Sequence, residues 1–223
     1  MRRVAITGMG VVSSIGADVA EVTLALKEAR SGVTFAPEFA EHGFKCQVYA
    51  KPTVNVEEAI DRRTRRFMGE GAAWNYIALR EAIADARLAE DEISHPMTGI
   101  VMGSGGPSTA SLVEAADVTR STKSTKRIGP TVVPKAMSST NSATLAVAYK
   151  ILGLNYSISS ACATSVHCIG AAAEQIMWGK QDIVFAGGGE DLHWTMANLF
   201  DAMGAMATSF NETPSTASRA YDK

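Results

Sequence analysis

Cys162 has the residue type and the surroundings for covalent chemistry. It lies in Ser159–Ser165, which reads Ser-Ser-Ala-Cys-Ala-Thr-Ser, between a predicted strand over Asn155–Ser159 and a predicted helix over Val166–Trp178. At the start of a helix, the unpaired backbone N–H groups and the positive end of the helix dipole favour an anion. A thiolate is such an anion, and it is the nucleophilic form of cysteine. The sequence therefore predicts a nucleophilic thiol whose small neighbours leave room for a substrate.

A packing role for Cys162 is the alternative, because free cysteines are among the most buried residue types. The chain has two further cysteines, Cys46 and Cys168. Three cysteines at irregular spacing resemble neither a disulfide framework nor a zinc site, and they indicate a reducing, cytoplasmic setting. Cys168 lies six residues beyond Cys162, which places it about 120° away around the same helix. We interpret Cys46 and Cys168 as packing residues.

The histidines do not complete a catalytic set around the thiol. A cysteine nucleophile usually needs a base or a cation nearby. His167 lies five residues beyond Cys162, about 140° around the helix, and should point away from the thiol. His193 follows a glycine cluster, where a lone histidine is more often a surface residue. The chemistry predicted for Cys162 is therefore incomplete within this chain.

Composition limits the function classes. The 223 residues are 46% hydrophobic and 20% charged, with a formal net charge of -2, which describes an ordinary globular chain and not a polyanion-binding one. No apolar run approaches the ~18 residues that cross a membrane. The start of the chain faintly resembles a signal peptide, but it breaks at Thr7–Gly10 without a cleavage site. We read Val4–Thr7 as a first strand.

Strand-like and helix-like segments alternate along the chain. The expected strands are Val4–Thr7, Lys45–Ala50, Gly99–Gly103, Asn155–Ser159 and Asp182–Ala186. The expected helices run from Asp18 to about Arg30, over Thr64–Arg87, over Ser108–Thr119, within Pro134–Leu152 and over Val166–Trp178. Apolar strands separated by helices predict an α/β protein with a mostly parallel, covered sheet. The helix after Cys162 is apolar on most sides, so we expect it to be buried between layers.

Two glycine clusters follow predicted strands. Gly103–Pro107 loosely resembles a dinucleotide or phosphate loop, but it lacks the Lys-Ser/Thr pair of a P-loop and the later acidic residue of a dinucleotide site. Gly187–Gly189 precedes Glu190, and glycines at such places more often serve tight turns and close backbone packing. We favour the packing interpretation for both clusters.

The basic residues are unevenly distributed. They form two clusters, Arg62, Arg63, Arg65 and Arg66 in the first and Arg120, Lys123, Lys126, Arg127 and Lys135 in the second. A solvated charged face is the usual explanation for such runs. A docking surface for an acidic partner is the alternative, because a local patch steers binding even where the net charge is negative. Nucleic acid is disfavoured, since no aromatic interleaving or recognised module accompanies the clusters.

The sequence resembles the bacterial β-ketoacyl-acyl carrier protein synthases, most closely those of type I. The segments that carry the resemblance are Ala5–Gly8, Val12–Gly16, Arg30–Gly32, Ala82–Ala86, Gly103–Gly106, Asn155–Ser165, Asp182–Glu190 and Phe200–Ala205. The resemblance implies a thiolase-like fold, of which residues 1–223 form the N-terminal half as one domain. The family's catalytic histidines, its lysine and its glycine-rich oxyanion loop would belong to the other half.

The resemblance also implies a mechanism. Cys162 would accept an acyl chain from acyl carrier protein as a thioester, and malonyl-acyl carrier protein would then lose carbon dioxide and attack it. The backbone N–H of Cys162 would be one donor of the oxyanion hole, a contact worth a few kcal/mol at the transition state. No metal and no organic cofactor is implied.

Site residues follow from the same resemblance. The substrate-binding positions would be Ala161, Phe200, Met203, Gly106, Pro107 and Met137. Met137 would approach the pocket of a second subunit, because the family is dimeric. The carrier-protein contacts would be Arg62, Arg63, Arg66, Lys123, Lys126 and Arg127. Gly106 favours type I over type II, where a bulkier residue is frequent, and Pro107 departs from a more glycine-rich form of that loop.

Three other functions are alternatives. A type II synthase shares the fold, a non-catalytic chain-length factor lacks the nucleophile, and another thiolase-fold enzyme would act on coenzyme A thioesters. Cys162 argues against the second, and the Ser-Ala-Cys-Ala-Thr-Ser run and the basic patch argue against the third. We expect the chain alone to be catalytically incomplete. We also expect a half-fold to leave apolar area exposed on its sheet and on the helix after Cys162.

Overall fold

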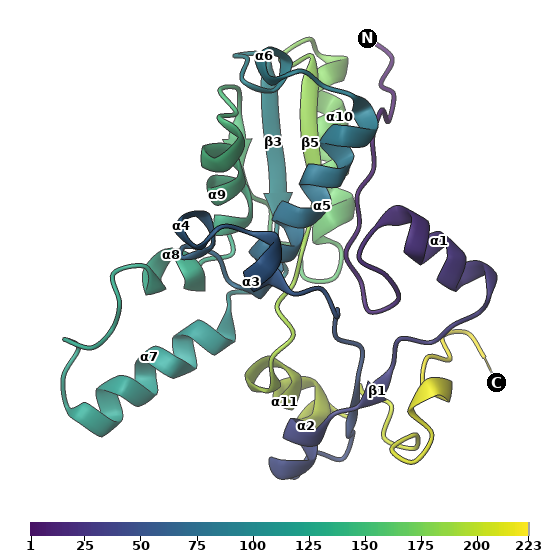
Figure 1. Cartoon of the computed structure of the whole chain (residues 1–223), viewed down its shortest axis with the longest axis vertical. Helices are drawn as coiled ribbons and strands as arrows, with labels where there is room; N and C mark the ends of the chain where they lie inside the picture. Colours follow the sequence, from purple (N-terminus) through teal and green to yellow (C-terminus); the bar gives the residue numbers. More distant parts are fainter. Residues whose placement is uncertain (223) are drawn as a thin grey trace. The chain divides into compact units, whose positions relative to one another are not determined.

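The computed structural model describes residues 1–222, which form two compact units (Figure 1). Unit 1 combines Met1–Gly10 with Asn55–Asp191. Unit 2 combines Val11–Val54 with the chain from Leu192 onwards. Each unit is described by itself, and Cys162 belongs to unit 1.

Unit 1 is built on a three-stranded parallel sheet. Its strands are β4 (Asn155–Tyr156), β3 (Thr98–Gly103) and β5 (Ile183–Gly188), in the order β4-β3-β5. Ile100 of β3 is aligned with Asn155 on one side and with Phe185 on the other. Every residue of β3 is buried, as expected for an apolar central strand. The predicted α/β class with a parallel sheet is therefore confirmed.

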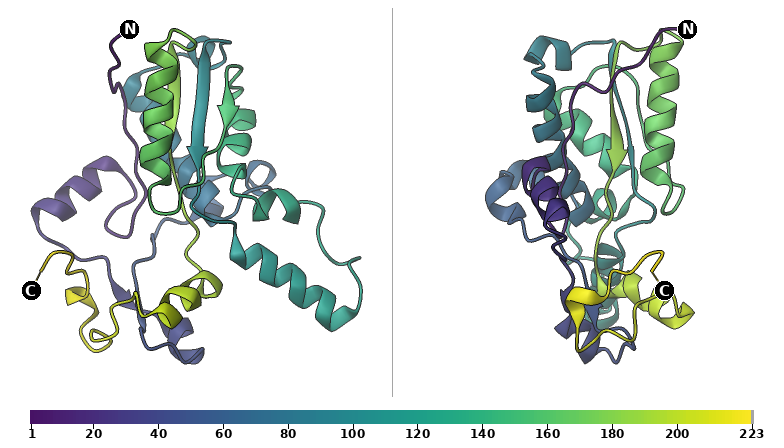
Figure 2. Two further views of the ribbon diagram at one scale, coloured as in Figure 1. Left: turned by 180° about the vertical axis from the view of Figure 1, so that it is seen from behind. Right: turned by 90° about the vertical axis from the view of Figure 1, so that its right-hand side faces the viewer.

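Helices cover both faces of this sheet (Figure 2). The side view shows α10 (Thr164–Met177) on one face and α5 (Glu70–Ala86) on the other, where α9 (Thr140–Tyr149) also contacts β3. Val101 of β3 packs with Cys168 and Ala172 of α10. The remaining helices of unit 1 are α3 (Val56–Ala59), α4 (Arg62–Arg65), α6 (Glu90–Ile93), α7 (Thr109–Thr122) and α8 (Val132–Ala136).

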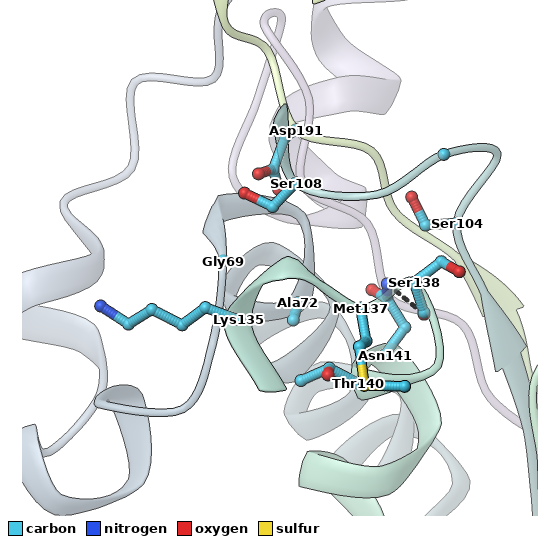
Figure 3. A pocket seen from close by; sticks show the side chains of 11 residues that line it. Gly69, Ala72, Ser104, Ser108, Lys135, Met137, Ser138, Thr140, Asn141 and Asp191 are labelled. Carbon is cyan, nitrogen blue, oxygen red and sulfur yellow. Dashed lines mark hydrogen bonds between the residues drawn. The ribbon is translucent and has the colours of Figure 1, made fainter. Parts of the chain in front are cut away.

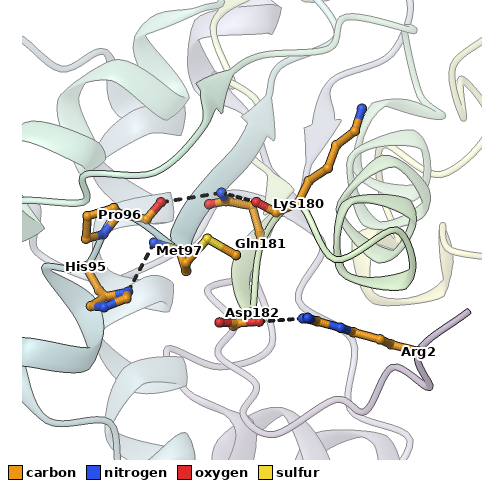
Figure 4. A network of polar contacts seen from close by, with 7 residues as sticks. All are labelled: Arg2, His95, Pro96, Met97, Lys180, Gln181 and Asp182. Carbon is orange, nitrogen blue, oxygen red and sulfur yellow. Dashed lines mark hydrogen bonds and ion pairs between the residues drawn. The ribbon is translucent and has the colours of Figure 1, made fainter.

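Polar contacts join the segments at the amino ends of the strands (Figure 4). The Gln181 side chain donates to the Pro96 carbonyl at 3.4 Å, and the backbone N–H of Met97 donates to His95 Nδ1 at 3.1 Å. Arg2 forms an ion pair of 2.6 Å with Asp182, just before β5. These contacts fix the strand starts on the edge opposite to Cys162.

Unit 2 is smaller and has its own core. Its elements are α1 (Val19–Lys27), β1 (Thr34–Phe35), α2 (Pro37–Glu41), β2 (Val48–Tyr49), α11 (Trp194–Met203) and η1 (Pro214–Thr216). Strands β1 and β2 pair antiparallel. Phe39 stacks on Phe44 at 4.7 Å between ring centroids, in a cluster that includes Ala197 of α11. The buried Asp201 accepts hydrogen bonds from the backbone N–H groups of Lys45 and Cys46, which ties α11 to the segment before β2.

The expected first strand over Val4–Thr7 is wrong. The segment carries no strand, and its neighbours are held elsewhere: the backbone N–H of Arg2 donates to the Met177 carbonyl at 3.1 Å, and that of Met9 donates to Asp85 at 3.0 Å. Ile6 is 81% exposed. Because the backbone on both sides bonds to helices, β-branched residues alone do not make a strand here.

Two long helices of the prediction are each divided. The span Thr64–Arg87 contains the end of α4 and then α5, because Gly69 is the extended N-cap at which α5 begins. The span Pro134–Leu152 contains the end of α8 and then α9. The predicted start of α1 is confirmed, since Asp18 caps it by accepting from the N–H of Glu21 at 2.8 Å.

Helix α10 is buried along one stripe only, which corrects the expectation that it is buried between layers. Its buried residues are Thr164, Cys168 and Ala172, spaced four apart so that they face the sheet. Val166 is 69% exposed and Ile169 50% exposed. Apolar area on this helix is therefore exposed at Val166 and Ile169, in agreement with the expectation for the helix after Cys162.

Candidate active site

The carboxyl ends of the three parallel strands meet at one edge of unit 1. Strand β3 leads into Gly103–Pro107, β4 leads toward the turn at Cys162, and β5 leads into Gly189 and Glu190. In open α/β sheets this edge is where ligands bind. The two glycine clusters and the cysteine, which are far apart in the sequence, therefore converge on the edge that favours a site.

The turn that carries Cys162 is held by Thr164. The Thr164 hydroxyl accepts from the backbone N–H of Ser160 and donates to the carbonyl of Ala161, both at 2.8 Å. The N–H of Thr164 also donates to the Ala161 carbonyl at 3.1 Å. Ala163 is the N-cap of α10, so Cys162 immediately precedes the helix, as the sequence predicts.

Ala161 adopts a left-handed backbone conformation, with φ at +50°. This region disfavours residues with a Cβ and costs about 1–3 kcal/mol, and such residues cluster at functional sites. The hydrogen bonds from Thr164 hold Ala161 in this conformation. The result is a fixed, sharp turn that leaves Cys162 exposed at its tip.

The three cysteines differ sharply in accessibility. Cys162 is exposed, whereas Cys46 is 1% and Cys168 0% exposed. Burial raises the pKa of the Cys168 thiol, and a backbone hydrogen bond at Ile158 only partly opposes this. The packing role predicted for Cys46 and Cys168 is confirmed, and Cys162 is the thiol that a reagent can reach.

Glycines allow the three loops to approach one another. A Cβ on Gly103 would clash with the carbonyl oxygen of Ile158, and one on Gly105 would stand 2.9 Å from the carbonyl oxygen of Ala161. Real Cβ atoms do not come this close to backbone oxygens. The loop after β3 therefore lies directly against the turn that carries Cys162, at positions where glycine leaves the room.

Glu190, which follows the second glycine cluster, accepts hydrogen bonds from the backbone N–H groups of the first cluster that could otherwise bind an anion. One oxygen of Glu190 accepts from the Ser104 hydroxyl at 2.8 Å and from the N–H of Gly106 at 3.3 Å, and the other accepts from the N–H of Gly105 at 2.7 Å. A phosphate would need these same N–H groups. The dinucleotide interpretation of Gly103–Pro107 is therefore rejected in favour of the packing interpretation.

A small hollow of about 10 Å³ lies beside this loop (Figure 3). Ser104, Gly106, Met137 and Asp191 are among the residues that line it, and the Lys135 side chain extends away from it. A volume of this size is enough for about one water molecule. The hollow brings Gly106 and Met137 together, but it does not accommodate an acyl chain.

The other substrate positions lie on different elements. Pro107 is exposed at the end of the loop after β3, and Ala161 is exposed in the turn before Cys162. Phe200 and Met203 lie on α11 of unit 2, where they are 42% and 69% exposed. Their grouping into one acyl pocket stays a prediction.

The six predicted carrier-protein contacts are all exposed in unit 1. They lie on and just after α4 (Arg62, Arg63, Arg66) and just after α7 (Lys123, Lys126, Arg127). Asp61 caps α4, and the hydrogen bond from the Thr64 side chain is the main cause that lowers the pKa of its carboxyl. Arg65, which was left out of the predicted contacts, instead forms an ion pair with Glu57.

None of the described contacts of the histidines involves the Cys162 thiol. His193 caps α11 by accepting from the N–H of Thr195 at 3.3 Å, and His42 stacks on Trp194 at 3.9 Å between ring centroids. His167 is exposed on α10. Among residues 1–222 no hydrogen bond joins a histidine to Cys162, and no group of three His, Cys, Asp or Glu could hold a metal ion.

Sequence reasoning missed Thr164 and Glu190. Thr164 was visible only as a small neighbour of Cys162, and its double hydrogen bond depends on the folded turn. Glu190 carried a signal, since an acidic residue directly after three glycines at a strand end can reach the backbone of a neighbouring loop. The contact itself spans 84 to 86 residues.

Comparison with known proteins places this chain in a family. The family model described as "Beta-ketoacyl synthase, N-terminal domain" matches residues 1–223. The chain belongs to this family. In sequence, this β-ketoacyl synthase N-terminal domain is 52% identical over 222 residues to 3-oxoacyl-[acyl-carrier-protein] synthase 1 of Haemophilus influenzae and 50% identical over 223 residues to that of Escherichia coli. The matches cover 100% of the chain and 55% of each relative, so the chain spans about half their length.

Solved structures share the fold of this β-ketoacyl synthase domain. A β-ketoacyl synthase from Burkholderia phymatum matches with a TM-score of 0.86 and 30% identity, over 96% of the chain and 53% of that protein. A ketosynthase described in complex with its type II PKS acyl-carrier protein matches with a TM-score of 0.77 and 26% identity, over 93% and 50%. These neighbours confirm the predicted thiolase-like class. Among the described residues, no helix has the length and apolar character to cross a membrane.

Proposed function

We propose that the protein carrying this chain is a 3-oxoacyl-acyl carrier protein synthase of fatty acid biosynthesis, with residues 1–223 as its N-terminal domain. The observation that supports this most strongly is the exposed Cys162 at the start of α10, in a chain 52% identical to a synthase of that name. Type I is favoured over type II, since the type 2 synthase of Rhizobium meliloti is 30% identical.

The proposed reaction has two stages. The Cys162 thiolate attacks the carbonyl carbon of an acyl thioester and expels the thiolate of acyl carrier protein, which takes up a proton from water. Malonyl-acyl carrier protein then loses carbon dioxide, and the resulting carbanion attacks the acyl-Cys162 carbonyl. The new carbon–carbon bond extends the chain by two carbons, and the sulfur of Cys162 leaves as thiolate. The backbone N–H of Cys162 would stabilise the oxyanion of each tetrahedral intermediate. The reaction needs neither a metal nor an organic cofactor.

The partners are proposed from the exposed basic residues and the relatives. Acyl carrier protein, in acyl and malonyl forms, would dock on the six basic residues that lie on and just after α4 and just after α7, because they offer exposed positive charge. A homodimer, with Met137 toward the second subunit's pocket, and a cytoplasmic location complete the proposal. A chain-length factor is the second candidate, since one structural neighbour contains that protein class, but Cys162 disfavours it.

The nucleophile is tested by intact-mass measurement after incubation with an acyl-acyl carrier protein. The full-length protein and its Cys168→Ala variant should each gain the mass of one acyl group, and Cys162→Ala should gain none. Cys168→Ala is the matched control, because it removes a thiol only six residues further along the chain that is 0% exposed. An acyl adduct that survives Cys162→Ala would refute the assignment.

A further inference from the structure

Glu190 is exposed, yet its carboxylate accepts three hydrogen bonds. The donors are the Ser104 hydroxyl and the backbone N–H groups of Gly105 and Gly106, at 2.8, 2.7 and 3.3 Å. Hydrogen bonds to an ionised carboxylate are roughly twice as strong as neutral ones. An exposed side chain normally moves freely, so three such bonds indicate that this carboxylate holds the loop.

The held loop lies against the turn before Cys162. A Cβ on Gly105 would stand 2.8 Å from a Glu190 carboxylate oxygen and 2.9 Å from the Ala161 carbonyl oxygen. The Gly105 backbone is therefore enclosed between the carboxylate and the turn. The Ser159 hydroxyl also donates to the Gly105 carbonyl at 3.2 Å, which ties the loop to the same turn from its other side.

The neighbouring acid serves a different element. Asp191 accepts from the N–H of Gly71 at 2.6 Å, in the first turn of α5. Glu190 and Asp191 thus carry the same charge at adjacent positions after β5, but the hydrogen bonds from the loop beside Cys162 go to Glu190, whereas Asp191 accepts from α5. This pair supplies a matched control within the chain.

We propose that Glu190 is a positioning residue for acyl transfer to Cys162. Its carboxylate fixes the backbone of Gly103–Pro107 against the Ala161 turn, and so fixes the wall that the acyl chain meets beside the thioester. The inference rests on the proposed function, because it assigns this loop to the acyl group of that reaction. Removing the negative charge should loosen the loop and change which acyl chains are accepted.

The experiment uses the full-length protein with Glu190→Gln and, as control, Asp191→Asn. Hydrogen exchange reports the N–H groups of Gly105 and Gly106, and mass spectrometry reports the initial rates of Cys162 acylation from a short and a long acyl-acyl carrier protein. In Glu190→Gln we expect exchange of both amides to rise about tenfold or more, since a hydrogen bond to a charged group is lost. The long-to-short rate ratio should change as well, whereas Asp191→Asn should leave both readings as in the wild type.

The outcomes separate the two claims. If the wild-type protein takes up no acyl group, the proposed function fails, whatever the exchange result. If acylation is normal but Glu190→Gln keeps the wild-type rate ratio, or if the two amides exchange no faster, the positioning role is overturned. Should Glu190→Gln not fold, Glu190→Asp replaces it, because that variant keeps the charge and withdraws the oxygens by one methylene.

Discussion

Alkylation of this chain by iodoacetamide offers a direct test of the site, because its three cysteines serve as internal standards. Cys162 is exposed at the tip of its turn, while Cys46 is 1% and Cys168 0% exposed. A buried thiol reacts only when the structure around it opens. We therefore expect Cys162 to be modified first, with the other two following at rates set by opening.

The expected ratio of alkylation rates, Cys162 against a buried cysteine, follows from the free energy of opening the structure around the buried thiol. If opening around a buried cysteine costs about 5 kcal/mol, the low end for a folded domain, the open fraction is roughly 10⁻³ to 10⁻⁴, since each 1.4 kcal/mol is tenfold. Local opening is easier than global unfolding, so we take ~10²-fold as the lower limit for the rate ratio. Cys46 and Cys168 belong to different units, and each reports on the opening of its own unit.

The assay is a time course at neutral pH, quenched with excess thiol, digested and read by mass spectrometry for each cysteine peptide. The same reaction in denaturant supplies the intrinsic rates of the three cysteines. The reasoning is refuted if native Cys168 or Cys46 is labelled within about threefold of Cys162, because burial would then not protect them as the packing around β3 and α10 requires.

Other predictions concern stability and docking. Gly103→Ala should lower the free energy of unfolding by about 1–3 kcal/mol, because the added Cβ clashes with the backbone. Gly170→Ala should raise it by about 0.5–1 kcal/mol, because this glycine lies in the middle of α10 with nothing within 4 Å of an added Cβ. Chemical denaturation of both variants checks that the two changes have opposite signs. Burial raises the pKa of Cys168 above its usual value of 9.0, so the folded state keeps this proton longer than the unfolded state. Its contribution to stability should be full below pH 9 and decline as the pH rises, and Cys168→Ala should reduce that decline in denaturation curves taken across this range. Arg66→Glu should weaken binding of acyl carrier protein in low salt. Arg120→Glu should weaken it less, because Arg120 is already paired with Asp117 at 2.9 Å. Equal losses of affinity for the two variants in a binding titration would contradict the docking site.

Local patterns predicted the elements that position the site. Gly99–Gly103 and Asp182–Ala186 are short apolar runs bounded by glycine, and they became the buried strand β3 and its parallel neighbour β5. The change from Asn155–Ser159 to the helix beyond Cys162 was also visible, because β-strand residues give way to small residues and then to helix formers. Strand ends and helix starts are local events, so the junction at Cys162 could be predicted.

Long-range contacts explain the elements that the sequence patterns mispredicted. The apolar run Val4–Thr7 has strand-forming residues, but the hydrogen bonds of Arg2 and Met9 to other elements leave it unpaired. The division of Thr64–Arg87 depends on Gly69, beside which Asp191 accepts from the start of α5. Such contacts join residues 76 or more positions apart, and no periodic pattern in the sequence records them.

The site in unit 1 consists mostly of backbone groups and small side chains, and this limits the chemistry it can perform alone. Its thiol is accessible, and Thr164 fixes the turn, but the carboxylate of Glu190 is engaged with the loop after β3. Of the two histidines of unit 1, His95 accepts a hydrogen bond at the opposite edge of the sheet, and His167 is exposed on α10, whereas Cys162 precedes that helix. Attack by a thiolate requires no base, whereas decarboxylation of a malonyl group requires stabilisation of the charge that develops. We therefore expect alkylation of Cys162 in this chain, weak or absent self-acylation and no condensation; formation of a 3-oxoacyl product by the chain alone would show that unit 1 is less incomplete than its residues indicate.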